Sequence, residues 1–266
     1  MLSEIMLGQY FPGDSFIHQL DPRTKLLGTL FFIVAVFFAK TPLAYGLLVL
    51  FALLIIFLAK LPLLMVLKSL KPIWFIALIT VLIHAFTYPG NEVVWQWRFF
   101  TVTAEGLAMG GQMGARLLLL LLFSSVLTFT TSPIVLTDGI EKLLRPCKKI
   151  GVPAHEIAMM MTIALRFIPT LLEETDRIIK AQEARGADFG KGGIAGRIKN
   201  MLPLLVPLFV GAFRRADELA VAMEARCYRG GEGRTRMYEL RYNVKDYLAY
   251  LIMFVLVVTI CVISNL

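Results

Sequence analysis

Residues 171–186 read LLEETDRIIKAQEARG, and residues 214–227 read RRADELAVAMEARC. Both segments end in Ala-x-Glu-Ala-Arg followed by a small residue. Apolar residues recur every three or four positions in and before each segment, which is the pattern of an amphipathic helix. The repeat predicts two long helices, at about residues 154–185 and 196–228, that end in the same way.

Charge decides where these two helices can lie. The first carries eight charged residues from Arg166 to Arg185, and each charge at the centre of a bilayer costs about 2.5–3.5 kcal/mol. The second is nearly free of charge over residues 201–213 and strongly charged over residues 214–226. We therefore expect the first helix not to cross a membrane, and the second to reach lipid with its first half at most.

The remainder of the chain has the composition of a membrane protein with several spans. Of its 266 residues, 58% are hydrophobic and 17% charged, and the mean hydropathy is +0.72. The three cysteines and three histidines are scattered, so neither a disulfide framework nor a metal site is predicted. Five apolar segments are candidate spans, at about residues 26–39, 42–59, 72–88, 106–131 and 247–263.

The positive charge gives an expected topology. Residues 132–245 hold 19 Lys and Arg against 13 Asp and Glu, six of the eight net charges of the chain. Positively charged segments stay in the cytoplasm, so we expect this segment and the N-terminus in the cytoplasm and the C-terminus on the other side of the membrane. No stacking platform or recognition motif accompanies the charge, so a nucleic-acid partner is not predicted.

The predicted organisation is an all-α membrane protein in three parts. Residues 1–131 form a membrane domain with four spans, residues 132–245 a cytoplasmic domain, and residues 246–266 a C-terminal transmembrane helix. Residues 89–105 read as a polar loop whose two tryptophans suit a membrane interface.

Two features within the predicted spans allow two interpretations each. Gly106, Gly110 and Gly114 repeat every four residues, which lets another helix approach closely, either from this chain or from a partner. Arg116 is either a functional group in the membrane or a side chain that reaches the interface.

Chemistry-bearing motifs are missing. The GADFGKGG segment at 186–193 lacks the spacing and the Ser/Thr of a phosphate loop, and HEIAM at 155–159 lacks the second histidine of a zinc protease. We therefore predict no catalytic residues, no cofactor bound by this chain, and no enzymatic activity. A membrane-embedded lipid- or prenyl-modifying enzyme and a self-sufficient solute channel are the alternatives that remain open.

The arginine at each helix end also has two interpretations. Arg185 and Arg226 could cap the last carbonyls of their own helices. Alternatively, small neighbours leave room for the helix tip to enter a groove, where the guanidinium can donate to carboxylates or carbonyls of a partner. Because the arrangement occurs twice, we favour docking on two similar receptors.

At this point the chain resembles a known family. The segments SFIHQLDPRTKLL, TSPIVLTDGIEKLL, residues 151–189 and LVPLFVGAFRRADELAVAMEARCYRGG are similar to the EcfT (CbiQ-like) transmembrane coupling subunits of energy-coupling-factor (ECF) transporters. These are vitamin and metal importers of the ATP-binding-cassette (ABC) class. The likeness runs nearly end to end, and the paired Ala-Arg-small endings are its most specific part.

The resemblance implies a role for named residues. It implies three coupling helices, here at about residues 134–150, 154–185 and 197–228, and two ABC ATPase subunits that bind ATP in place of this chain. The helix tips would seat in grooves of these ATPases through Ala184, Arg185, Gly186, Ala225, Arg226 and Cys227. A small substrate-binding membrane (S) subunit would contact apolar faces that include Gly106, Gly110, Gly114, Met160 and Met161.

Overall fold

A computed structural model of the chain describes residues 10–88, 93–97, 100–187, 194–231 and 240–265. The chain divides into two compact units. One, here called the apolar unit, comprises Gly8–Gly139 and Tyr238–Leu266, and the other, the amphipathic unit, comprises Met1–Leu7 and Ile140–Met237. Among the described residues, regular structure is helical apart from one two-stranded hairpin.

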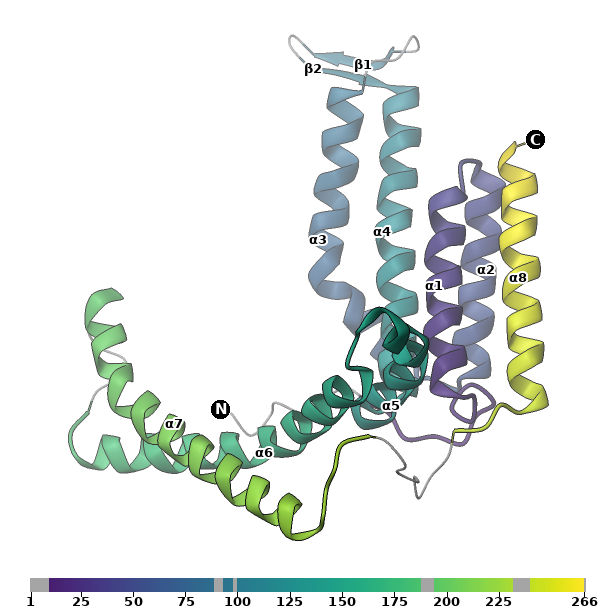
Figure 1. The fold of residues 1–266 in the computed structure, drawn as a ribbon. Coiled ribbons are helices and arrows are strands. Elements are labelled where there is room, and N and C mark those ends of the chain that lie inside the picture. Colours follow the sequence, from purple (N-terminus) through teal and green to yellow (C-terminus); the bar gives the residue numbers. More distant parts are fainter. Residues whose placement is uncertain (1–9, 89–92, 98–99, 188–193, 232–239, 266) are drawn as a thin grey trace. The chain divides into compact units, whose positions relative to one another are not determined.

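The apolar unit is a set of upright helices (Figure 1). In it, α3 packs along α4, while α1 contacts both α4 and α8, and α2 also contacts α4 and α8. The helices are α1 (Pro22–Phe38), α2 (Pro42–Leu58), α3 (Leu63–Thr87), α4 (Ala104–Thr130) and α8 (Val244–Asn265).

Helix starts in the apolar unit follow the sequence signals. Thr41 precedes Pro42, and its hydroxyl accepts a hydrogen bond from the Ala44 N–H at 3.3 Å. Proline suits the first helical turn because its missing N–H would have no intrahelical partner there. At α4, the Thr103 hydroxyl accepts from the Gly106 N–H at 3.1 Å in the same way. The predicted start of the second apolar helix is confirmed.

Two predictions for this unit need correction. Helix α3 begins at Leu63, so Pro72 lies inside the helix and does not begin it. Between α3 and α4 the chain forms an antiparallel hairpin of β1 (Val93–Trp97) and β2 (Phe100–Thr103), where a loop was predicted. The reason lies in composition, because Val, Trp, Phe and Thr favour strands and outweigh the turn-like reading of the flanking residues.

An aromatic stack joins the helices of the apolar unit at its centre. Phe32 of α1 and Phe123 of α4 are buried with ring centroids 4.0 Å apart and nearly parallel planes. Offset-stacked aromatic pairs contribute about 0.5–1.5 kcal/mol beyond the area they bury. The same core includes Leu48 from α2 and Ile260 from α8, both fully buried. The C-terminal helix is therefore an integral part of this unit.

A buried carboxylate fixes the start of α8 beside the start of α1. Asp246 is 2% exposed and accepts hydrogen bonds from the N–H groups of Asp21 at 2.9 Å and Asn243 at 2.7 Å. The Arg23 guanidinium bonds the Asp21 carboxylate and lies 3.9 Å over the Tyr242 ring. These contacts pair a buried charge with donors, as a low-dielectric interior requires.

The glycine stripe of α4 packs against α3. Gly106, Gly110 and Gly114 are buried, and a Cβ on Gly110 would stand 2.8 Å from the carbonyl oxygen of Val81. Only the absence of a side chain allows the two backbones to come so close. The structure thus shows an intramolecular contact of these three glycines with α3, and their contact with a partner subunit stays a prediction.

Four described helices are long and apolar enough to cross a membrane: α3, α4, α8 and α6 (Ala154–Ala184). The first three correspond to predicted spans. Helices α1 and α2 have 17 residues each, which is the lower end of the length that spans a bilayer. Helix α6 is apolar enough to cross a membrane only over an 18-residue window. The mean hydropathy of this window, 1.3, is the lowest among the four helices. The chain is thus a multi-span membrane protein, while the count of five spans stays a prediction.

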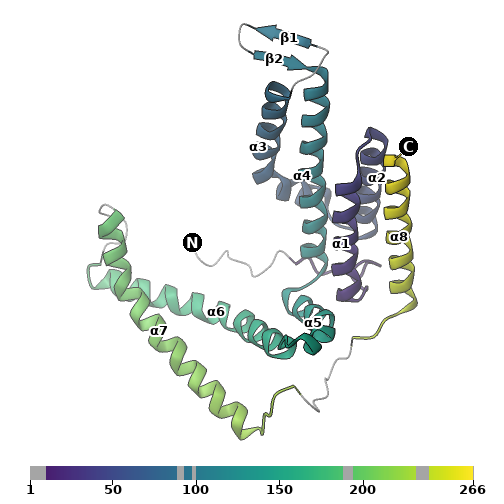
Figure 2. The ribbon, with the colours of Figure 1, turned by 45° about the horizontal axis from the view of Figure 1, so that its top comes forward.

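The amphipathic unit contains the charged helices (Figure 2). Helix α5 (Pro133–Leu144) carries the boundary between the units and continues into the 3-10 turn η1 (Arg145–Ile150). Helices α6 and α7 (Ile194–Ala225) follow and pack on each other. Their bounds agree with the helices predicted from the repeat to within a few residues.

Candidate functional site

The end of α6 is closed by a cap of backbone hydrogen bonds. Arg185 is the last residue of near-helical geometry, with φ −88° and ψ 6°, and Gly186 has φ +87°. The Gly186 N–H donates to the Glu183 carbonyl at 2.9 Å, and the Ala187 N–H donates to the Gln182 carbonyl at 3.0 Å. This pair of bonds is the Schellman cap, which requires a residue of positive φ after the arginine.

The end of α7 has the same cap. Cys227 has φ 55° and its N–H donates to the Glu224 carbonyl at 2.8 Å. The Tyr228 N–H donates to the Met223 carbonyl at 3.1 Å. Because the donors and acceptors occupy equivalent positions of the repeat, the two tips share a backbone geometry as well as a sequence.

The cap explains the small residue that ends each copy of the repeat. Glycine adopts positive φ at no steric cost, whereas a residue with a Cβ loses about 1–2 kcal/mol there. Sequence reasoning attributed the small residue to room around the arginine. The structure adds that this position must also adopt positive φ to turn the chain. Gly186 is small and adopts positive φ without strain, whereas Cys227 adopts it only under strain.

Among the described residues, the side chain of neither tip arginine contacts its own helix through a hydrogen bond or an ion pair. Within the described part of the chain, the guanidinium groups of Arg185 and Arg226 form no hydrogen bond or ion pair. The capping interpretation therefore does not account for them, since backbone N–H groups already satisfy the carbonyls at these ends. All six residues predicted for docking are exposed: Ala184, Arg185, Gly186, Ala225, Arg226 and Cys227.

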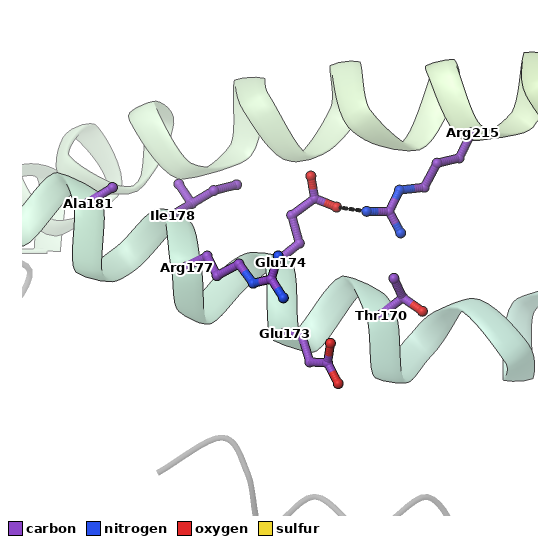
Figure 3. A pocket seen from close by; sticks show the side chains of 7 residues that line it. All are labelled: Thr170, Glu173, Glu174, Arg177, Ile178, Ala181 and Arg215. Carbon is purple, nitrogen blue, oxygen red and sulfur yellow. Dashed lines mark hydrogen bonds and ion pairs between the residues drawn. The ribbon is translucent and has the colours of Figure 1, made fainter.

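An ion pair joins α6 to α7 behind the tips (Figure 3). The Arg215 guanidinium of α7 donates to the Glu174 carboxylate of α6, and both side chains are more than two-thirds buried. A cleft of about 340 Å³ lies alongside. Its lining residues are Thr170, Glu173, Glu174, Arg177, Ile178, Ala181 and Arg215. No signal in the sequence indicated this pair, because its two residues lie 41 positions apart on different helices.

A second contact ties the segment after α7 to the start of α6. The His155 ring accepts or donates at both nitrogens, with Nδ1 3.1 Å from the Glu141 carboxylate and Nε2 3.3 Å from the Tyr228 hydroxyl. Gly231 lies against the same ring, because a Cβ there would be 2.5 Å from it. His155 therefore connects α5, α6 and the chain beyond the α7 tip. Its isolated place in the sequence gave no signal of this role.

Residues 13–237 match the CbiQ family, described as cobalt transport protein. The chain belongs to the CbiQ family. It is 65% identical over 258 residues to the energy-coupling factor transporter transmembrane protein EcfT of Acidaminococcus fermentans. This alignment covers 97% of this chain and 96% of that protein. The EcfT protein of Clostridium kluyveri is 54% identical, over 97% of this chain and 96% of that protein. The EcfT protein of Bacillus subtilis is 48% identical, over 92% of this chain and 93% of that protein.

Membership of the CbiQ family confirms the predicted resemblance and the transport function. The relatives are named as membrane components of transporters and not as enzymes. The prediction that the chain is not an enzyme is thereby confirmed, and the alternative of a lipid- or prenyl-modifying enzyme receives no support.

The remaining predicted contact residues of this CbiQ family member lie on α6. Met160 is 58% exposed and Met161 is 36% exposed. Further along, α7 presents an exposed apolar surface of Met201, Leu202, Leu205, Val206, Phe209, Val210 and Phe213. Apolar surface of this extent on charged helices is typical of binding surfaces for protein or membrane.

Proposed function

We propose that the chain is the transmembrane coupling subunit of an ECF importer, with Arg185 and Arg226 as its docking groups for two ABC ATPase subunits. The observation that carries this proposal is the pair of tips. Each has a closed backbone cap and an exposed arginine with no hydrogen-bond or ion-pair partner among the described residues. A planar guanidinium with five donors suits carboxylates and carbonyls of a groove.

The proposed mechanism is the transfer of displacement through helices. ATP binds to the ATPase subunits, which close on each other and move the two tips with them. Helices α6 and α7 have 31 and 32 residues, about 46 and 48 Å at a rise of 1.5 Å per residue. They pass the displacement to a small substrate-binding membrane subunit, which contacts apolar surface that includes Met160 and Met161. That subunit then opens inward and releases its substrate.

The proposed topology follows from charge. The N-terminus and the coupling helices α5, α6 and α7 lie in the cytoplasm of a bacterial cell, and the C-terminus of α8 lies outside. The basic excess of residues 132–245 supports this orientation. The charged second half of α6 supports its place outside the hydrocarbon core, although α6 contains an 18-residue apolar window.

Co-purification tests the docking proposal. The chain is co-produced with its two ATPase subunits, and Arg185→Glu with Arg226→Glu is expected to abolish their recovery on an affinity tag carried by the chain. Arg214→Glu is the matched control, because Arg214 is an exposed arginine of α7 whose partner is the neighbouring Glu218. Undiminished recovery with the double variant would refute docking through the tips.

A further inference from the structure

The ion pair between Glu174 and Arg215 connects equivalent positions of the sequence repeat. The two residues are 41 positions apart, and the same offset relates Arg185 to Arg226. At a local two-fold axis, each residue meets its own equivalent in the other element. The contact of Glu174 with Arg215 is one that such an arrangement of α6 and α7 requires.

The contact lies at the same distance along each helix from the tip arginine. Arg185 follows Glu174 by eleven residues, and Arg226 follows Arg215 by eleven residues. Eleven residues correspond to about three helical turns and about 16 Å. Because about three full turns separate each tip arginine from the crossing residue of its helix, both residues lie on the same helix face.

Close packing at the crossing holds the carboxylate in place. A Cβ on Gly211 would lie 3.1 Å from Glu174 Oε1, so this oxygen rests against the backbone of α7. The other oxygen, Oε2, accepts from the Arg215 guanidinium one turn later. The exposed pair of Arg214 and Glu218, with side chains 80% and 64% exposed, connects only residues of α7.

We infer that Glu174 and Arg215 are positioning residues that pin the crossing of α6 and α7 and so set the separation of the two docking tips. The inference rests on the proposed docking of Arg185 and Arg226. A slip at the crossing moves both tips relative to each other, and two ATPase grooves at a fixed spacing no longer receive both. The pair thereby keeps the movement of the ATPase subunits coupled to the movement of α6 and α7.

Distance measurement on the full chain in lipid nanodiscs, without partners, tests the crossing itself. Spin labels are placed at Glu183→Cys and Glu224→Cys, which are exposed and equivalent in the repeat, after the native cysteines are changed to serine. Glu174→Gln and Arg215→Gln are each expected to shift or broaden the distance distribution, although Glu174→Gln keeps the size of the side chain. The exchanged pair Glu174→Arg with Arg215→Glu restores it, and Arg214→Gln leaves it unchanged.

Transport by the assembled importer supplies the functional test. ATP-driven uptake is expected to fall by roughly fivefold or more in each single variant, as for loss of a coupled contact, and to recover in the exchanged pair. An unchanged distance distribution in both single variants overturns the inference, whether or not the tips bind ATPases. A changed distribution with unchanged uptake also overturns it. Failure of docking itself would show separately, as undiminished co-purification of the Arg185→Glu, Arg226→Glu variant.

Discussion

The two tips of the amphipathic unit have the same backbone and different support. Beyond the α7 tip, Tyr228 and Gly231 contact His155, so the chain is held against the start of α6. Residues 185–187 form no hydrogen bond outside their own helix among the described residues. A shared motif thus specifies how a helix ends, whereas contacts remote in sequence determine how firmly that end is held.

The tips also differ at the position of positive φ. Gly186 occupies it in α6 and Cys227 in α7. Glycine there is relaxed, while cysteine carries a conformational cost of about 1–2 kcal/mol. The α7 tip therefore combines a less favourable cap with a contact to His155, and the α6 tip combines a favourable cap with no such contact among its described residues 185–187.

Charge reversal at one tip at a time is expected to have the largest effect. Arg185→Glu and Arg226→Glu should each weaken binding of the ATPase pair by about 2–4 kcal/mol, the range of an interface hot spot. Titration of labelled ATPases against the chain in nanodiscs measures this. If one reversal has no effect while the other abolishes binding, the two tips do not bind equivalent receptors, and the proposed equivalence of the tips is wrong.

Exchange of the small residues should have the next largest effect. Gly186→Cys is expected to destabilise the α6 cap by about 1–2 kcal/mol, and Cys227→Gly to stabilise the α7 cap by about 1 kcal/mol. Hydrogen exchange of the capping amides of Ala187 and Tyr228 reports both changes. Equal exchange rates before and after each substitution would contradict the role assigned to positive φ.

Loss of the tether should have a smaller and one-sided effect. Tyr228→Phe removes one hydroxyl contact to His155 and is expected to cost about 0.5–1.5 kcal/mol of local stability at the α7 tip. Faster hydrogen exchange at residues 226–231 measures it. Exchange at residues 185–187 of the α6 tip serves as the internal control, and an equal change there would show that the tether is not local to α7.

Substitution of the exposed pair on α7 should have the smallest effect. Arg214→Gln breaks the contact with Glu218, which joins two largely exposed side chains four residues apart. Pairs of this kind contribute about 0.3–0.5 kcal/mol. Thermal unfolding of the purified chain is expected to stay nearly unchanged, and a marked loss would mean that Arg214 supports the nearby Arg215 contact.

Local signals accounted for much of the fold. The apolar segment predicted from residue 42 gave the start of α2, and the repeat predicted α6, α7 and their matching ends. The third apolar segment was predicted to begin at Pro72, whereas α3 begins at Leu63 and contains Pro72. The hairpin of β1 and β2 was missed, because the polar flanking residues were taken to extend through the segment, although Val, Trp, Phe and Thr favour strands.

The sequence by itself determined the apolar helices, the charged helices and the six tip residues, because periodicity, charge and small residues act through neighbours along the chain. Only the tertiary structure decided that α3 covers the glycines of α4, that Glu174 meets Arg215, and that His155 meets Tyr228. These contacts join residues far apart in sequence, and their partners are chosen by how the helices pack in space.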